Sequence, residues 1–438
     1  MQDQSLESTS IKRFINEETI GGLILIACII VAMIWANSGF YDLYQYIWYD
    51  IKVGFVLGNI DMVSSLHHWI NDGLMAVFFF TIGLEIKREI MDGELSSMKK
   101  ASLPIAAAFG GMVVPAVLYT LVAAQNPEYL DGWGIPMATD IAFALGLMAM
   151  LGKKVNVNLK IFLMALAIAD DLGAVMVIAI FYTETIDYLE LLTGGGFILV
   201  LMAANYLGVR RTLFYGLVGF LGVWIAFIYS GVHATIAGVL IAFTIPARTK
   251  IGRMDFVEKL CALSADLARD TPSKSKLLTQ NQVKKLAEIE DLSDKAHTPL
   301  QQLEHSLHPL TIYFILPIFA LSNAGIRIEG SLMEMIIHPI SIGIIIGLVL
   351  GKSIGVSLVS GLMVRFKLAT LPEGVTFREI IGVSFMSGIG FTMSIFISEL
   401  AFSEGEYKQI AKVGIFLASI IAAVIGMAIL SSGKRKAE

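Results

Sequence analysis

The chain has 438 residues, of which 56% are hydrophobic and only 16% are charged, whereas soluble domains are about 45–50% apolar and about 25% charged. This composition excludes an ordinary soluble protein and indicates a membrane protein with the lipid bilayer as its solvent. A net charge of -5 excludes the basic surface that binds nucleic acid. Two cysteines, Cys28 and Cys261, cannot form a disulfide framework or a cysteine-based metal site.

Twelve apolar segments are long enough to cross a bilayer, since one span needs about 20 residues. We therefore predict an all-α polytopic membrane protein, with residues 1–438 as a single membrane domain. The seventh and eighth segments are separated only at Ser230-Gly231. The predicted spans lie near residues 18–37, 66–91, 101–124, 132–151, 159–182, 188–208, 212–229, 232–246, 309–325, 339–364, 379–402 and 408–431.

Lysine and arginine accumulate in loops on the cytoplasmic side of a membrane. The predicted spans place most basic residues on one side if both termini are cytoplasmic, and the outer loops then hold few: Lys52, Arg327, Lys408 and Lys412. The long hydrophilic loop 247–307 is then cytoplasmic. An amphipathic helix is expected at its start, and its second half, 282–303, could be a surface helix or a linker.

Two triplets of spans, residues 101–182 and 339–431, share one pattern. The middle span of each is interrupted, by Pro136 to Asp140 in the first and by Ser387 to Thr392 in the second. In the predicted topology the triplets start on opposite sides of the membrane and are inverted repeats with two crossing discontinuous helices. Such repeats indicate a transport site near the membrane midplane.

Ionisable residues are rare inside the predicted spans. The deep ones are Asp140, Asp170, Asp171 and a single cation, Lys352, and each carboxylate at bilayer depth costs at least about 2.5–3.5 kcal/mol. Asp170 and Asp171 point about 100° apart on a helix, so one can meet Lys352 while the other faces a hydrated cavity. Carboxylate oxygens suit a hard cation such as Na⁺ or Li⁺, and H⁺ competes for the same oxygens. A purely structural Asp–Lys pair is the alternative.

A second group of charges lies at the inner end of the second span. Glu85, Arg88 and Glu89 share one helix face through their i, i+3, i+4 spacing. Glu304, His305 and His308 precede the ninth span, and histidine titrates near neutral pH. Both a solvated salt-bridge cluster and a gating role fit this pattern.

Four stretches carry a resemblance to a known family: residues 138–146 (ATDIAFALG), 169–174 (ADDLGA), 230–235 (SGVHAT) and 387–393 (SGIGFTM). They resemble the NhaA-type sodium/proton antiporters, a family known for inverted repeats. The resemblance implies that Asp171 is the main cation-binding carboxylate and Asp170 its neighbour in cation binding or proton exchange. It also implies that Thr139 and Asp140 lie at the helix crossing, with Asp140 offsetting helix N-termini and Lys352 offsetting helix C-termini.

The resemblance further implies an electrogenic exchanger of the bacterial inner membrane that moves more protons in than Na⁺ or Li⁺ ions out. No cofactor is expected beyond these transported ions. The cluster implied for activation at alkaline pH comprises Glu85, Arg88, Glu89, Glu304, His305 and His308. The outer loop 42–62 is the counterpart of a dimerising hairpin, so we expect a homodimer in the lipid bilayer.

Two other functions are compatible with buried aspartates. Intramembrane aspartyl proteases carry them on different helices, typically with a Gly-x-Gly-Asp motif, and the sequence has no such motif. A sodium-coupled symporter would use the same broken helices, but it needs a pocket for an organic solute.

Overall fold

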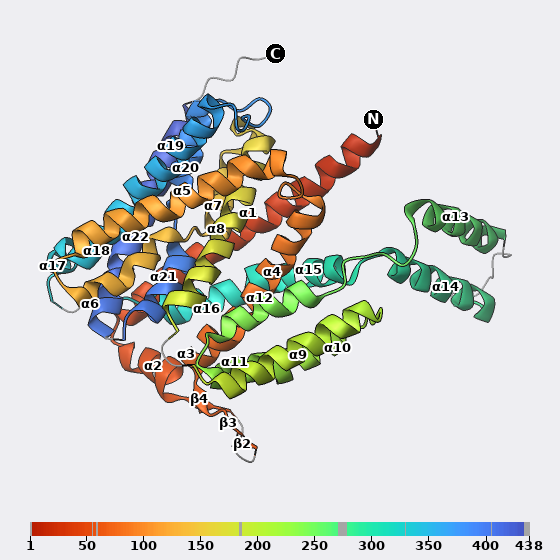
Figure 1. The fold of residues 1–438 in the computed structure, drawn as a ribbon, viewed down its shortest axis with the longest axis horizontal. Coiled ribbons are helices and arrows are strands. Elements are labelled where there is room, and N and C mark those ends of the chain that lie inside the picture. Colours follow the sequence, from red (N-terminus) through yellow and green to blue (C-terminus); the bar gives the residue numbers. More distant parts are fainter. Residues whose placement is uncertain are drawn as a thin grey trace.

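The computed structural model describes residues 2–54, 56–57, 60–183, 186–269, 278–328, 330–403 and 405–432. It shows a bundle of long helices with four strands of two residues each (Figure 1). The first residue and residues 433–438 lie outside the described part, so the prediction that both termini are cytoplasmic stays untested.

Nine helical segments of the described chain are long and apolar enough to cross a membrane. Five are unbroken helices: α1 (Gln2–Ala36), α5 (Met98–Ala123), α8 (Val157–Phe181), α9 (Tyr188–Tyr206) and α22 (Gly405–Ser431).

The other four contain a π-helical turn between α-helical parts. They are Leu66–Asp92 (α3 Leu66–His68 and α4 Met75–Asp92), Thr212–Ser230 (α10 Thr212–Val218 and α11 Ile225–Ser230), Pro299–Asn323 (α15 Pro299–Leu310 and α16 Leu316–Asn323) and Pro339–Arg365 (α18 Pro339–Ile345 and α19 Lys352–Arg365). Inserted π turns are frequent at functional sites.

Both interrupted spans of the prediction are bent helix pairs. The first joins Pro127–Met137, which begins with α6 (Pro127–Leu130), to α7 (Ile141–Met150) at 46°. The second joins α20 (Phe377–Met386) to α21 (Phe391–Ala401) at 47°. Counting each pair as one span gives eleven spans in the described chain.

The eighth predicted segment, 232–246, forms only α12 (Ala234–Thr244), a helix of 11 residues. Its separation from the seventh segment is confirmed, because α11 ends at Ser230 and Gly231 has φ +78°. This left-handed conformation suits glycine, which has no Cβ to clash.

The two predicted repeats contain the same succession of elements: a span, a bent pair and a span. Their first spans, α5 and α19, pack against each other through glycines. A Cβ on Gly355 would lie 2.1 Å from the Gly110 carbonyl oxygen, and a Cβ on Gly110 would lie 2.5 Å from the Gly355 carbonyl oxygen. The inverted relation between the repeats stays a prediction.

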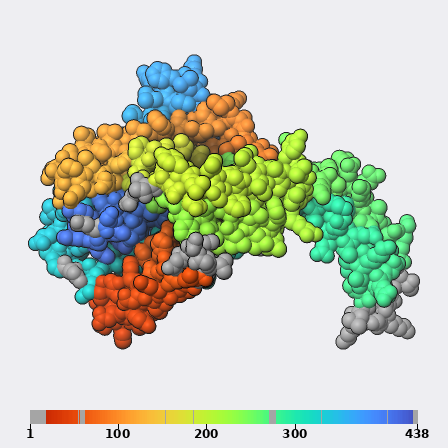
Figure 2. Space-filling model, turned by 60° about the horizontal axis from the view of Figure 1, so that its bottom comes forward, coloured from red at the N-terminus to blue at the C-terminus, as the bar shows by residue number. Residues whose placement is uncertain are grey.

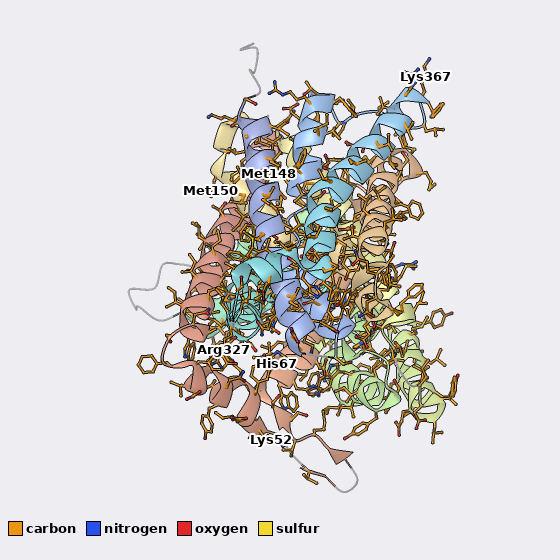
Figure 3. The ribbon with its side chains drawn as sticks, turned by 90° about the vertical axis from the view of Figure 1, so that its left-hand side faces the viewer. Lys52, His67, Met148, Met150, Arg327 and Lys367 are labelled. Atoms are coloured by element: carbon orange, nitrogen blue, oxygen red, sulfur yellow. The ribbon has the colours of Figure 1, made fainter. Side chains whose placement is uncertain are left out.

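The loop after the first span contains α2 (Tyr41–Gln45), a π-helical turn (Tyr46–Asp50) and a β-hairpin. Strand β1 (Lys52–Val53) pairs with β4 (Ser64–Ser65), and β2 (Val56–Leu57) pairs with β3 (Ile60–Asp61). We call the side of the bundle that carries these strands the hairpin end. Lys52, His67 and Arg327 lie toward this end, whereas Met150 and Lys367 lie at the opposite end (Figure 3). The short helix α17 (Leu332–Ile337) follows α16.

The hydrophilic loop forms two helices, α13 (Arg253–Arg269) and α14 (Gln280–Ala296), which project from the bundle as a lobe (Figure 2). We call the side that carries them the insertion end. The amphipathic helix predicted at the start is present, and the second half is a surface helix. The predicted boundaries at 307 and 309 are wrong, because α15 already begins at Pro299, where the Thr298 hydroxyl accepts a hydrogen bond from the Gln301 backbone N–H. The first turns of α15 are polar, so hydropathy does not indicate where this helix starts.

Candidate functional site

Asp140 joins the two broken helices where they cross. Its Oδ1 accepts a hydrogen bond of 2.9 Å from the Phe143 backbone N–H at the start of α7. Its Oδ2 accepts a bond of 2.9 Å from the Thr392 backbone N–H at the start of α21, and another from the Thr392 hydroxyl. Helix N-termini carry a partial positive charge of about half a unit. One carboxylate therefore bonds to two helix N-termini, at the crossing where the resemblance places Asp140.

The sequence breaks these helices at small residues that let two backbones approach. The Asp140 N–H donates to the Ile389 carbonyl at 2.7 Å. A Cβ on Gly388 would lie 2.3 Å from the Leu348 carbonyl oxygen, and one on Gly390 would lie 3.0 Å from the Ala138 carbonyl oxygen. A larger residue at Gly390 would press on the first break, and one at Gly388 would press on the Pro339–Arg365 span.

Asp170 pairs with Lys352 in the interior. The Lys352 Nζ lies 2.5 Å from Asp170 Oδ2, and both side chains are fully buried. The Lys352 Nζ also lies 3.0 Å from the Thr139 hydroxyl oxygen. That hydroxyl lies 2.8 Å from Asp170 Oδ2 and 2.8 Å from the Ser387 carbonyl oxygen. Its single proton can bond only one of them at a time, while the other must rely on a neighbouring donor.

Asp171 faces a cavity instead of the lysine. This cavity has a volume of about 50 Å³ and is also lined by Thr139, Asp140 and Thr392. Within the described structure, Asp171 Oδ1 and Asp170 Oδ1 are buried oxygens without a hydrogen-bond partner. Buried polar atoms are normally bonded, so these two oxygens are available to a proton or a cation. The predicted division of the pair between lysine and cavity matches this geometry.

The cavity continues from Asp171 to Glu85 and His308, on the side of the insertion end. There, His308 Nδ1 lies 3.6 Å from Glu85 Oε1. Arg88 bridges α4 and α15 through ion pairs of 3.0 Å with Glu304 and with its own neighbour Glu89. Five of the six residues predicted for regulation are thus brought together at the mouth of the cavity.

His305, the sixth residue, lies apart from this cluster. Its side chain is exposed on α15, while Glu304 and His308 lie on the face that packs against α4. The helical rotation of about 100° per residue separates His305 from Glu304.

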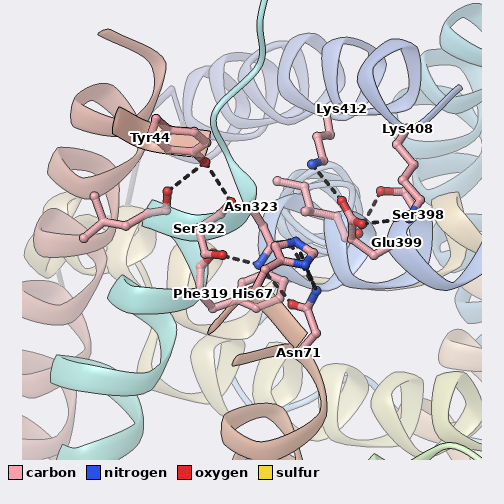
Figure 4. A network of polar contacts seen from close by, with 12 residues as sticks. Tyr44, His67, Asn71, Phe319, Ser322, Asn323, Ser398, Glu399, Lys408 and Lys412 are labelled. Atoms are coloured by element: carbon pink, nitrogen blue, oxygen red, sulfur yellow. Dashed lines mark hydrogen bonds and ion pairs between the residues drawn. The ribbon is translucent and has the colours of Figure 1, made fainter. Parts of the chain in front are cut away.

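Lys352 is not the only buried cation in the described spans. Lys412 in α22 is 2% exposed and lies 2.7 Å from Glu399 Oε1, and Lys408 lies 3.1 Å from Glu399 Oε2 (Figure 4). The sequence did contain the signal, because Glu399 and Lys412 fall within the predicted spans 379–402 and 408–431. The predicted topology nevertheless counts Lys408 and Lys412 among the basic residues of the outer loops.

Comparison with known proteins agrees with this geometry. The family described as "Na+/H+ antiporter 1" matches residues 12–430. The chain is 49% identical over 421 residues to "Na(+)/H(+) antiporter NhaA 1" of Psychromonas ingrahamii, covering 96% of this chain and 95% of that protein. It is 48% identical over 429 residues to "Na(+)/H(+) antiporter NhaA" of Acidithiobacillus ferrooxidans, covering 97% and 98% of the two chains. A relative from Oleidesulfovibrio alaskensis is 46% identical over 416 residues, covering 94% of this chain and 91% of the other.

These matches span nearly the whole chain, including both broken helices and the buried aspartates. Members of this family are secondary transporters and not enzymes. The chain is therefore a multi-pass membrane protein that belongs to the NhaA family of Na⁺/H⁺ antiporters.

Proposed function

We propose that this protein is an electrogenic antiporter of the bacterial inner membrane that exchanges cytoplasmic Na⁺, or Li⁺, for external H⁺. Protons and the cation compete for Asp170 and Asp171, and the exchange is activated at alkaline pH. In this proposal the insertion end faces the cytoplasm and the hairpin end faces outward. The observation that carries it is the pair of buried carboxylate oxygens beside a small cavity at the helix crossing.

The residues supply two places for protons. Asp171 binds one proton when no cation is present. A cation held by both carboxylates weakens the attraction between Asp170 and Lys352, and this loss of a buried partner favours the neutral form of the lysine. Release of two protons for one monovalent cation makes the exchange electrogenic. Thr139 lies within hydrogen-bond distance of both Asp170 and Lys352 and orients the pair.

The size of the cavity favours an ion over an organic solute. Its volume of about 50 Å³ is far below the roughly 300–1,000 Å³ of pockets for drug-sized ligands, although it is sufficient for a few water molecules. A solute symporter is therefore disfavoured. A protease is also disfavoured, because adjacent aspartates on one helix point in different directions and cannot share one catalytic water.

The charged cluster at the cavity mouth supports regulation by pH. Glu85, Arg88, Glu89, Glu304 and His308 link α4 to α15 through ion pairs. A change of protonation in such a network alters the attraction between two spans that line the cavity. We include this cluster as the pH-responsive element of the antiporter.

Everted membrane vesicles test the proposal. Vesicles that respire to an acid interior should lose part of their pH gradient when Na⁺ or Li⁺ is added, and more so at alkaline pH, while choline or an amino acid should have no effect. Vesicles without the protein give the background. No response to either cation between neutral and alkaline pH would refute the antiporter, and a response that requires an organic solute would favour the symporter.

A further inference from the structure

Three phenylalanines follow the cavity lining in the direction of the hairpin end. Phe79, Phe319 and Phe396 come from three of the spans that line the cavity, and each is fully buried. The ring centroids of Phe79 and Phe396 are 5.4 Å apart, and those of Phe319 and Phe396 are 6.3 Å apart. We call these three residues the phenylalanine plug.

A layer of polar residues lies beyond the plug on the same spans, about one turn past Phe319 and Phe396 and two to three turns past Phe79. His67 Nε2 lies 3.0 Å from Asn323 Oδ1, and the Asn323 side-chain N–H donates to Asn71 Oδ1 at 3.0 Å. Glu399 on α21 lies in the same layer (Figure 4). The plug is therefore covered on its far side by contacts between the spans that would have to separate to open it.

Glu399 fastens its span to a neighbour. It pairs with Lys412 at 2.7 Å and with Lys408 at 3.1 Å, both on α22, and the side chains of Glu399 and Lys412 are only 6% and 3% exposed. A buried ion pair is weak evidence for stability, because apolar residues of the same size often stabilise a protein as well; its best attested use is to select one arrangement. We call Glu399, Lys408 and Lys412 the outer clamp.

The outer clamp and the ion site lie on one short helix. The Thr392 N–H at the start of α21 bonds to Asp140, and Glu399 lies seven residues later, a rise of about 10 Å. Phe396 of the plug lies between them on the same helix. A tilt of α21 that removes Phe396 from the plug must therefore also change the outer clamp.

We propose that Glu399 is a positioning residue of the transport cycle. Through the outer clamp, Glu399 holds α21 against α22. This contact keeps the ion site closed toward the hairpin end, on the far side of the phenylalanine plug. The site then opens to the hairpin end only when Glu399 separates from Lys412 and Lys408. This inference rests on the proposed antiport, since it concerns access to the same site.

Thiol labelling tests access without requiring transport. Cys28 and Cys261 are replaced by alanine and serine, and Ile82→Cys supplies a thiol on the cavity wall, beyond the plug as seen from the hairpin end. A membrane-impermeant methanethiosulfonate is added to right-side-out and to everted vesicles. Glu399→Gln should accelerate labelling from the hairpin end roughly tenfold by shifting the population toward the open state. Glu399→Asp should retain the slow rate.

Glu406→Gln is the matched control, because Glu406 is an exposed carboxylate on α22 near the outer clamp. Its labelling rate should remain unchanged. Equal rates in Glu399→Gln and the background, or the same acceleration in Glu406→Gln, would overturn the proposal. If Glu399→Gln does not fold, Lys412→Met removes the other half of the pair and should accelerate labelling. Failure of both variants to fold would make the clamp purely structural and overturn the inference.

Transport kinetics give a second result. Fewer Glu399→Gln molecules are open to the cytoplasm, so the KM for cytoplasmic Na⁺ should rise by the same factor as the loss of that population, with a smaller change in kcat. An equal fall of kcat at constant KM would contradict the inference. Absence of exchange in the unmodified protein would refute the proposed function instead, because the labelling experiment stands independently.

Discussion

At the scale of single residues, two adjacent aspartates have different tasks. Asp170 is bonded to Lys352 and Thr139, whereas Asp171 lines the cavity with Asp140 and Thr392. Their side chains diverge because neighbours on a helix are about 100° apart. A site that needs both a paired carboxylate and a second carboxylate oxygen that faces a cavity can thus be built from one dipeptide.

Asp171→Asn should abolish exchange while leaving membrane insertion intact. An amide keeps the size of the side chain but can neither bind the proton nor supply negative charge to the cation. We expect a loss greater than roughly one hundredfold, since changes in groups that merely orient metal ligands already cost about 10–100-fold. Cation-induced alkalinisation of everted vesicles provides the measurement.

Asp131→Asn serves as the control, because Asp131 is an exposed carboxylate at the start of the residues that lead into the first crossing. It should exchange normally. Retained transport with unchanged apparent Na⁺ affinity in Asp171→Asn would move the cation site elsewhere.

At the scale of elements, helix crossings and helix ends position the site. α5 and α19 approach closely enough that Gly110 and Gly355 face each other's carbonyl oxygens, and α19 begins with Lys352. The two broken helices are held by a shared carboxylate. The site therefore depends on backbone contacts as much as on its charged side chains.

Gly355→Ala should destabilise the protein, because its Cβ would lie 2.1 Å from the Gly110 carbonyl oxygen. Overpacking of this kind typically costs about 1–3 kcal/mol. Thermal unfolding in detergent would show a lower Tm. The matched control is Gly195→Ala on α9, where no atom lies within 4 Å of the added Cβ and where alanine should stabilise the helix by roughly 0.5–1 kcal/mol. Equal Tm changes in the two variants would contradict this account of the crossing.

The α4–α15 contact gives a prediction about pH. His308→Gln removes the group that faces Glu85 across this contact, so the pH of half-maximal exchange should shift while the maximal rate changes less. His305→Gln changes an exposed residue three positions away and should leave the profile unchanged. Exchange rates across a pH series in vesicles measure both. Overlapping profiles for His308→Gln and the unmodified protein would make the cluster structural only.

At the scale of the whole molecule, the bundle carries different attachments at its two ends. The β-hairpin lies between α2 and α3 in the chain, and α13 and α14 form the lobe at the insertion end (Figure 1). No described residue of either attachment lines the cavity. The homodimer that we expect to form through the hairpin should therefore be separable from exchange.

Deletion of residues 52–65 should convert the expected homodimer to a monomer that still exchanges ions. The two ends of the hairpin are already adjacent, since the Leu66 N–H donates to the Ile51 carbonyl at 3.1 Å, so the deletion need not move the spans. Light scattering on the purified protein in detergent gives the mass. A dimer of unchanged stability after deletion would place the interface on another surface.

The sequence alone predicted the membrane class, eleven of the spans, both helix breaks and the residues at the crossing. These properties are local: every span must satisfy its own backbone polar groups in lipid, and interruptions occur at recognisable glycine and proline positions. The start of α15 differs from the prediction because its first turns are polar. The segment predicted at 232–246 is present as α12, which is shorter because apolar length alone does not show where a helix ends.

Only the tertiary structure decided which aspartate meets the lysine and which charges are buried together. Asp170 and Lys352 are 182 positions apart, and apolar patterning does not specify how each helix is rotated within a bundle whose members are apolar on most faces. The sequence places Glu399 and Lys412 within predicted spans, but their pairing depends on the same helix rotation. The composition determined that this is a membrane protein. The packing of its helices determined which ionisable residues lie together in the candidate ion site.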